Sequence, residues 1–201
     1  MKKILICFTA FFLLVGACSI LPIHGEAGIY DNVIRLHVLA NSDSERDQAL
    51  KLSVRDAVLQ RAEPLLQGVS EKGEAEAVLR ASLDEIKAAA EGELRRQGAE
   101  NTVTVTLGLE EYPTRRYESL AFPAGEYLSL RVMIGEAEGQ NWWCVLFPPL
   151  CLTAAAADSD SEDVCLSAGI SGEQYRVIAN TDSTKYRLRF KLLEVAKAWF
   201  E

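Results

Sequence analysis

The sequence predicts a single α+β domain, in which a mainly antiparallel sheet packs with two long N-terminal helices and a C-terminal helix. Three observations predict this fold. Residues 33–39 alternate between apolar and polar side chains, which is typical of a strand. Apolar residues then recur at steps of three and four as far as residue 97, which is typical of amphipathic helices. Beyond residue 102, period-two alternation returns in several runs.

The first 27 residues are predicted to be an export signal and a short linker. Lys2 and Lys3 precede an apolar run over residues 4–15 and then two small residues, which is the pattern of a secretory signal. The run is short for a membrane span, which needs ~20 residues. Cys18 follows where a bacterial lipoprotein would be processed, so the alternatives are lipidation of Cys18, ordinary cleavage, or an uncleaved anchor. Residues 28–201 are then predicted to form one domain.

The overall charge argues for a protein partner. The chain of 201 residues carries a formal net charge of −8, and loss of Lys2 and Lys3 with the signal would make it more negative. An acidic domain is a poor nucleic-acid binder, because such binding rests on neutralising phosphates. Anionic lipid headgroups would repel it as well. We therefore expect no nucleic acid, and membrane contact only through the export signal or a lipid anchor.

The first predicted strand, residues 33–39, has one apolar and one polar face. Ile34, Leu36 and Val38 share one side, and Arg35 and His37 share the other. The alternation predicts a strand with one buried face.

Two helices should follow this strand. Ser42 and Glu45 have the spacing of a capping box, so the first helix should begin there, and Pro64 and Gly68 should end it. One apolar stripe predicts a second helix over residues 71–97.

The second half of the chain is predicted to be mostly β. Strands are expected over residues 103–109, 115–122, 126–134 and 142–147. Residues 158–163 are interpreted as a solvated acidic loop. Residues 177–183 echo residues 38–44, which predicts a further strand ending followed by a helix cap. The alternatives are a duplicated strand–cap–helix unit and, which we favour, reuse of a common capping solution. Strong helix formers over residues 192–198 predict the C-terminal helix.

Three cysteines lie outside the signal region, and they leave two alternatives open. Cys144 and Cys151 flank Pro148 and Pro149, which could turn the chain and allow a disulfide. The other alternative, which we favour from the sequence, is a pair of buried free thiols. With Cys165 the number is odd, so at least one thiol stays unpaired within the monomer. Three cysteines without nearby histidines predict no metal site.

No residue cluster in the sequence predicts a catalytic reaction. His37 is the only histidine outside the signal region, and no nucleophile or metal partner is marked for it. The GxSxG, HExxH, P-loop and GxGxxG motifs are all absent. Cys144 lies among aromatic and apolar neighbours, and burial suppresses the thiolate. We therefore expect neither an enzyme nor a cofactor.

Several ordered blocks resemble one family. The segment IRLHVLANSDSERDQALKLSVRDAVL at residues 34–59 and NWWCVLFPPLC at residues 141–151 are similar to the stage II sporulation protein R family. Shorter blocks at residues 113–115, 123–127 and 189–194 extend the resemblance over most of the mature domain. Residues 153–172 match nothing distinctive in the family.

The resemblance implies a signal between two cells of an endospore-forming bacterium. Such a protein is made in the forespore and secreted across its membrane into the intermembrane space. There it activates a membrane-embedded aspartic protease of the mother cell, which matures the mother-cell sigma factor sigma-E. The competing class is an extracytoplasmic envelope-associated structural protein or hydrolase. His37 beside a carboxylate, or Cys144 in an open pocket, would favour a hydrolase.

The contact surface for a partner is predicted from the polar turn and the aromatic block. In a strand, Trp142 and Trp143 point to opposite faces, so one should be core and the other could anchor an interface. The full set of residues in the hypothesis is Arg35, His37, Asn41, Ser42, Asp43, Asn141, Trp142, Trp143, Pro148 and Pro149.

Overall fold

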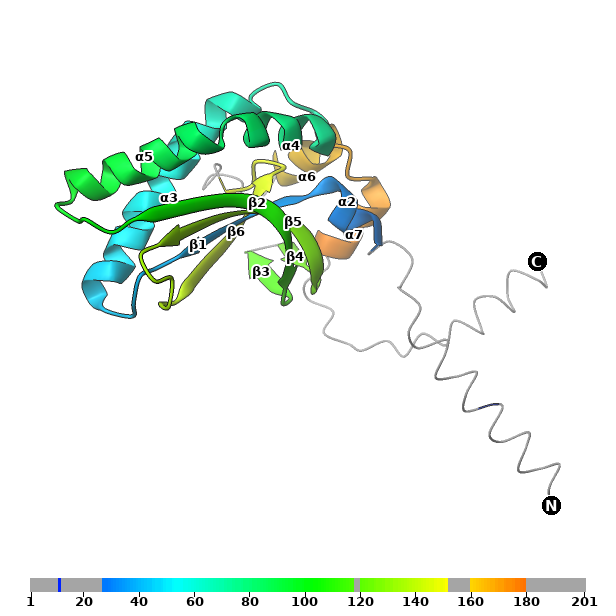
Figure 1. The fold of residues 1–201 in the computed structure, drawn as a ribbon. Helices are drawn as coiled ribbons and strands as arrows, with labels where there is room; N and C mark the ends of the chain where they lie inside the picture. Colours follow the sequence, from blue (N-terminus) through cyan, green and yellow to red (C-terminus); the bar gives the residue numbers. More distant parts are fainter. Residues whose placement is uncertain (1–10, 12–26, 118–119, 152–159, 180–201) are drawn as a thin grey trace, which may run out of the picture. The chain divides into compact units, whose positions relative to one another are not determined.

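The structure, a computed structural model, describes residue 11 and residues 27–117, 120–151 and 160–179 (Figure 1). The predicted export signal lies almost wholly outside the described residues, and the predicted C-terminal helix lies outside them. The elements in chain order are α2 (Ala27–Asn32), β1 (Ile34–Leu39), α3 (Glu45–Leu66), α4 (Lys72–Ala81), α5 (Leu83–Arg96), β2 (Val103–Tyr112), β3 (Arg115–Tyr117), β4 (Leu120–Phe122), β5 (Gly125–Ile134), β6 (Asn141–Phe147), α6 (Asp160–Ser167) and α7 (Gly172–Ala179).

The four-stranded sheet confirms the predicted α+β class. Its strand order is β2-β5-β1-β6, with β1 and β5 parallel and the other two neighbouring pairs antiparallel. The parallel pair follows from the long helical crossover between β1 and the later strands, since parallel strands cannot be joined by a tight turn. β1 is an inner strand, so its side chains meet neighbours on both sides. His37, for example, pairs with Arg131 on β5 and with Trp143 on β6.

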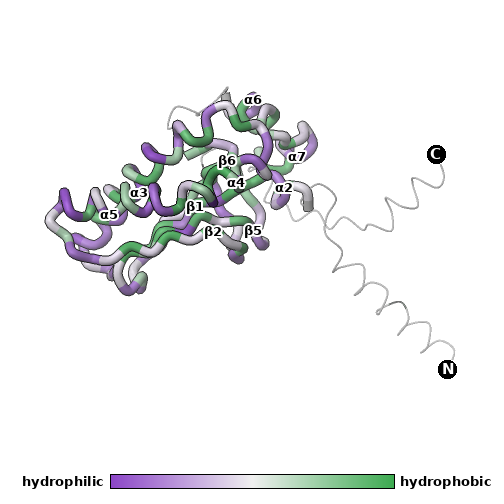
Figure 2. The backbone as a smooth tube through the Cα atoms, turned by 45° about the horizontal axis from the view of Figure 1, so that its top comes forward, coloured by the Kyte–Doolittle hydropathy of each residue, from purple (hydrophilic) through white to green (hydrophobic). Residues whose placement is uncertain are grey.

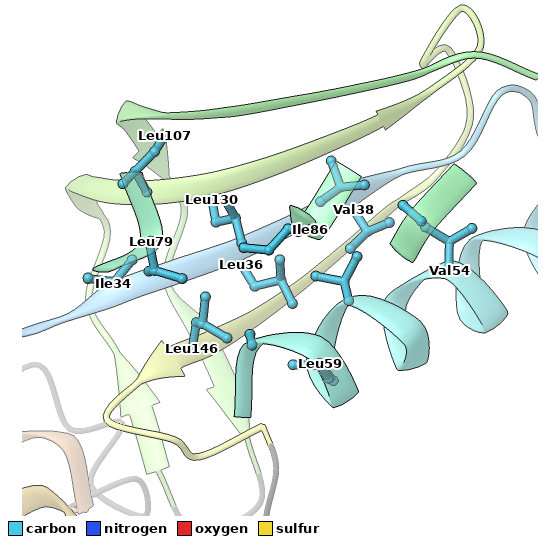
Figure 3. Close-up of a cluster of buried hydrophobic side chains, with 14 of the residues drawn as sticks. Ile34, Leu36, Val38, Val54, Leu59, Leu79, Ile86, Leu107, Leu130 and Leu146 are labelled. Carbon is cyan, nitrogen blue, oxygen red and sulfur yellow. The ribbon is translucent and has the colours of Figure 1, made fainter. Parts of the chain in front are cut away.

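One face of the sheet packs against the helices. Alternate side chains of β1 point toward α3 and α5, as Figure 3 shows for Ile34, Leu36 and Val38. Figure 2 shows the matching pattern, with hydrophobic and hydrophilic residues alternating along α3 and α5. We call this cluster the helix-side core; its fully buried members include Ile34, Leu36, Val38, Val54, Val58, Ala62, Leu79, Ile86, Ala90, Leu130, Val132 and Leu146.

The helix boundaries differ from the predicted ones. Ser44, rather than Ser42, caps α3, and its hydroxyl accepts a hydrogen bond from the Asp47 backbone N–H at 3.1 Å. The Ser42 hydroxyl instead donates to the Asp47 carboxylate and accepts from the Ser44 N–H, which lies before the helix. The helix predicted over residues 71–97 is two helices, because Ser82 (φ −109°, ψ 9°) leaves the helical conformation between α4 and α5.

The second face of the sheet has a core of its own, which corrects the prediction that β1 buries one face. Every residue of β1 is buried. The residues 115–122, predicted as one strand, contain β3 and β4, which pair with each other as a separate two-stranded sheet. We call the second cluster the hairpin-side core; it comprises Ile29, Val33, Tyr112, Leu120, Phe122, Tyr127, Val145, Cys165, Ile170 and Ile178.

Two predictions for the C-terminal part are wrong. Residues 177–179, predicted as a strand ending, are the last turn of α7. The acidic stretch predicted as a loop enters α6 at Asp160. The short apolar run predicts a strand. It lies instead in a helix, one face of which packs Ile178 against the hairpin-side core.

Candidate functional site

Arg35 is the most unusual residue on the second face of the sheet. It is fully buried, and its guanidinium carbon lies 4.6–5.4 Å from the centroids of four aromatic rings. Such placement is favourable because the ring faces carry partial negative charge, and more so away from water. The four rings come from β2, β3, β4 and β5: Tyr112, Tyr117, Phe122 and Tyr127.

The Arg35 guanidinium also ties the β3–β4 hairpin to the sheet. Its Nη2 donates to the Tyr117 hydroxyl at 2.7 Å, whereas Nε and Nη1 have no hydrogen-bond partner among the described residues. Burial raises the pKa of Tyr117, and the nearby Arg35 charge opposes that rise. Arg35 therefore serves the core in this conformation and presents no surface to a partner.

His37 lies one step further along the same face, held on both ring nitrogens. Nδ1 is 2.8 Å from Glu110 Oε1, and Nε2 is 2.9 Å from Asn141 Oδ1. Arg131 Nε lies 3.2 Å from the same Glu110 oxygen. Burial acts to raise the pKa of Glu110, but the hydrogen bond and charge of His37, with smaller contributions from Ser129 and Arg131, outweigh it and leave the pKa lowered.

The His37–Glu110 contact is the arrangement that would favour a hydrolase, yet its geometry lacks a nucleophile. A general base needs its second nitrogen directed at the group it activates. Here that nitrogen meets the Asn141 amide oxygen, and His37 is only 5% exposed. Among the residues that the structure describes, no group of three His, Cys, Asp or Glu could hold a metal ion. Burial also raises the pKa of the Cys165 thiol to about 11, which disfavours the thiolate.

The polar turn over residues 41–43, predicted as a contact surface, is hydrogen-bonded to the start of α3 and to the loop after β5. Asn41 and Ser42 donate to the Asp47 carboxylate at 2.8 and 2.6 Å, and these hydrogen bonds lower the pKa of Asp47. From the other side, Asn41 Oδ1 accepts from the Glu136 N–H at 3.1 Å. Asp43 Oδ1 accepts from the backbone N–H of residue 140 at 2.7 Å. Most of the hydrogen-bonding capacity of this turn is thus used within the fold.

Gly135 makes this loop contact sterically feasible. Its φ of +57° lies in the left-handed region, which favours glycine. A Cβ there would collide with the Asn41 side-chain oxygen. The turn after β1 and the loop after β5 therefore depend on each other.

Trp142 and Trp143 point to opposite faces, as predicted. Trp142 packs against the helix-side core, with the Arg55 guanidinium carbon 4.8 Å from its ring centroid. Trp143 packs at the border of the hairpin-side core, with the Arg115 guanidinium carbon at 3.5 Å. Both residues are half-buried, so the prediction that one of them belongs to the core is wrong; each packs at the border of a core.

A disulfide joins Cys144 on β6 to Cys151, seven positions further along the chain. The alternative favoured from the sequence, a pair of free thiols, is therefore wrong for the structure; the prolines between them do turn the chain, as the other alternative required. Pro148 is buried and Pro149 is half-buried. Cys165 is a free, buried thiol.

The sequence reasoning missed the partners that organise this face. Glu110, Tyr112, Arg115 and Arg131 were not singled out, although Glu110 falls on the same face of the β2 alternation as Thr104 and Thr106. Their joint role depends on the strand register. Among the described residues, no helix combines the length and apolarity needed to cross a membrane.

The fold and the site together define an α+β domain in which Arg35 and His37 are buried among aromatic rings and hydrogen-bond partners. The family model for Stage II sporulation protein R matches residues 30–157. Over 158 residues the chain is 40% identical to "Stage II sporulation protein R" of Bacillus subtilis (strain 168), covering 75% of this chain and 70% of that protein. No solved structure matches the chain.

The chain belongs to the stage II sporulation protein R family. It therefore has a role in sporulation, and it belongs to a class of proteins that are not enzymes.

Proposed function

We propose that the chain is an exported intercellular signalling protein of endospore formation. It is secreted across the forespore membrane and activates a membrane-embedded aspartic protease of the mother cell. That protease then matures the sigma factor sigma-E. The observation that carries the proposal is the family match over residues 30–157, which spans β1 through β6.

The site geometry is consistent with a ligand. Activation requires that the ligand bind the active protease conformation more tightly than the inactive one. A rigid surface serves that purpose, because little entropy is lost when it binds. The second sheet face is rigidly built, since β1 is buried throughout and His37 is hydrogen-bonded on both sides.

The structure narrows which residues of the predicted contact surface can reach a partner. Arg35, His37 and Pro148 are buried, so they would act by supporting their neighbours. Asp43 and Asn141 are exposed. The half-buried members are Asn41, Ser42, Trp142, Trp143 and Pro149.

The proposal can be tested in a non-sporulating bacterium that produces the matching membrane protease and the sigma-E precursor. This protein is added with its export signal, and the precursor size is followed by immunoblot. We expect cleavage that requires this protein, the protease and the export signal. A chain without residues 1–17 is the matched control, because it keeps the domain but loses the signal.

Absence of cleavage, with the protein shown to be folded and exported, would contradict the proposal. In the same cells, Cys18→Ala separates the modes of retention. If a lipid anchor holds the protein near the protease, the variant loses palmitate incorporation and cleavage falls. If cleavage is unchanged, lipidation is not required for the signal.

A further inference from the structure

The second face of the sheet divides into two halves. One half is packed by the hairpin-side core, from Val33 and Tyr112 to Val145. The other half, nearer the loop between β5 and β6, carries two cross-strand rows fixed by the register. We call it the open half; its rows are Thr106–Arg131–His37–Trp143 and Thr104–Met133–Leu39–Asn141.

The open half is accessible at most of its positions among the described residues. Thr104, Thr106 and Asn141 are exposed, and Met133 is half-buried. The Arg131 side chain keeps 37% of its surface exposed. The polar residues Thr104, Thr106 and Asn141 lie at its edges, and a polar, accessible rim is usual for an interface.

Arg115 stacks on Trp143 at the border of the open half. The Arg115 guanidinium carbon lies 3.5 Å from the Trp143 ring centroid, and Trp143 is also 5.2 Å from the His37 ring. Tryptophan and arginine are the residue types most enriched at interface hot spots. Stacking orders the arginine before a partner arrives, which lowers the entropy cost of binding.

The charges on this surface differ from those of the chain as a whole. The chain has 29 acidic and 21 basic residues. On the open half the charges of Glu110 and Arg131 offset each other, because Arg131 Nε lies 3.2 Å from the Glu110 oxygen that His37 also contacts. Arg115 forms no ion pair with any described residue, and its Nε is buried without a hydrogen-bond partner. No described carboxylate therefore balances the Arg115 charge, and a planar guanidinium suits the carboxylate of a partner.

We propose that the open half, with the Arg115–Trp143 pair at its border, binds an acidic polypeptide segment of the partner protein. The proposal deepens the function proposed above, in which that partner is the membrane protease. The positive charge of Arg115, which no described carboxylate balances, would orient the partner, and Trp143 would supply apolar contact area.

Thr106 allows a test in which only the sign of one charge differs. It is exposed and lies directly opposite Arg131 on the neighbouring strand. In the processing cells, Thr106→Lys should keep precursor cleavage near the wild-type rate. Thr106→Glu adds a negative charge beside Arg131, which Glu110 already contacts, and this added charge would repel an acidic segment. The cleavage rate should fall by about tenfold, the effect of losing one strong interface contact.

The Arg115–Trp143 pair has a matched control on the other face of β6. Arg55 stacks on Trp142 in the same way, but it is already paired with Asp56 at 2.7 Å. Arg115→Glu should abolish most cleavage, whereas Arg55→Glu should not. Protein level and far-UV circular dichroism are measured for every variant, so that a misfolded chain is recognised.

Direct contact is tested with the photo-crosslinker p-benzoylphenylalanine, placed at Thr104 or, as the control, at Leu52 on α3, which is 41% exposed. The full chain is produced in sporulating cells, and crosslinked peptides are identified by mass spectrometry. We expect position 104 to capture a peptide rich in Asp and Glu, and position 52 to capture none.

The outcomes separate this proposal from the proposed function. If wild-type protein drives cleavage but Thr106→Glu and Thr106→Lys behave alike, the open half is not the binding surface. If wild-type protein drives no cleavage, the proposed function fails. The crosslink at position 104 then tests by itself whether the open half binds an acidic segment. Capture of lipid, of a peptide without acidic residues, or of nothing at position 104 would overturn the inference.

Discussion

Both faces of β1 are buried, but different forces stabilise them. On the helix side, Ile34, Leu36 and Val38 pack into an apolar core. On the hairpin side, the intervening Arg35 and His37 are buried among aromatic rings and hydrogen-bond partners. The difference shows that a buried position of a strand can hold a polar or charged residue. A polar side chain is tolerated where neighbouring strands supply its partners.

The largest effect should follow from a cavity on the helix side. Leu130→Ala should lower the free energy of unfolding by about 3 kcal/mol, because Leu130 is fully buried and its neighbours can collapse only partly. Urea unfolding measures the change. Leu109→Ala is the control: Leu109 is 67% exposed, and the loss there should stay below about 0.5 kcal/mol. Equal losses would show that Leu130 does not lie in a tightly packed core.

A smaller effect is expected from one hydroxyl on the hairpin side. Tyr112 and Ser129 share a hydrogen bond of 2.7 Å, and both residues are buried. Tyr112→Phe keeps the ring but leaves the Ser129 hydroxyl without that partner, which should cost about 1.5 kcal/mol in urea unfolding. Tyr175→Phe, where the hydroxyl contact with Ser161 is 3.2 Å and partly exposed, should cost less. The opposite order would contradict the account of this face.

Arg35→Met tests whether the buried charge stabilises the fold. The substitution loses the aromatic contacts and the bond to Tyr117, but it also removes the cost of desolvating a cation. These opposing effects should leave a loss of about 1 kcal/mol in urea unfolding. A loss as large as that of Leu130→Ala would mean that the two faces contribute equally. Near-UV circular dichroism would then show whether the hairpin has detached from the sheet.

The smallest effect should appear as a pH dependence on the hairpin side. The pKa of Glu110 is lowered from 4.5 in the folded protein, so its ionised form stabilises the fold above that value. This contribution is lost as the pH falls through the folded pKa. The stability difference between wild type and Glu110→Gln should therefore shrink on acidification below 4.5, measured by urea unfolding across pH. Glu111→Gln removes the same charge at an exposed neighbour and controls for net charge.

Local pattern was sufficient for part of the candidate site. The alternation on β1 correctly predicted that Ile34 and Arg35 lie on opposite faces of the sheet. The adjacent positions on β6 predicted the same for Trp142 and Trp143, also correctly. The same reasoning failed at residues 177–179, where a short apolar run fits a strand or one face of a helix equally well. Only packing against the hairpin-side core distinguishes the two.

The surroundings of Arg35 and His37 were beyond the reach of sequence reasoning. Their partners Tyr117 and Glu110 lie 82 and 73 positions away along the chain. Whether a polar residue on a strand is exposed or buried depends on what later packs over it. That depends on register and on the placement of the β3–β4 hairpin.

The sequence by itself determined the α+β class, the strands of the main sheet to within a few residues, and the resemblance to the stage II sporulation protein R family, because these rest on periodicity and ordered local blocks. The tertiary structure decided that β1 is buried on both faces, that the polar turn after it fastens two loops, and that Arg115 stacks on Trp143 beside an accessible part of the sheet. Those features depend on contacts between distant segments, whose pairing no local pattern specifies.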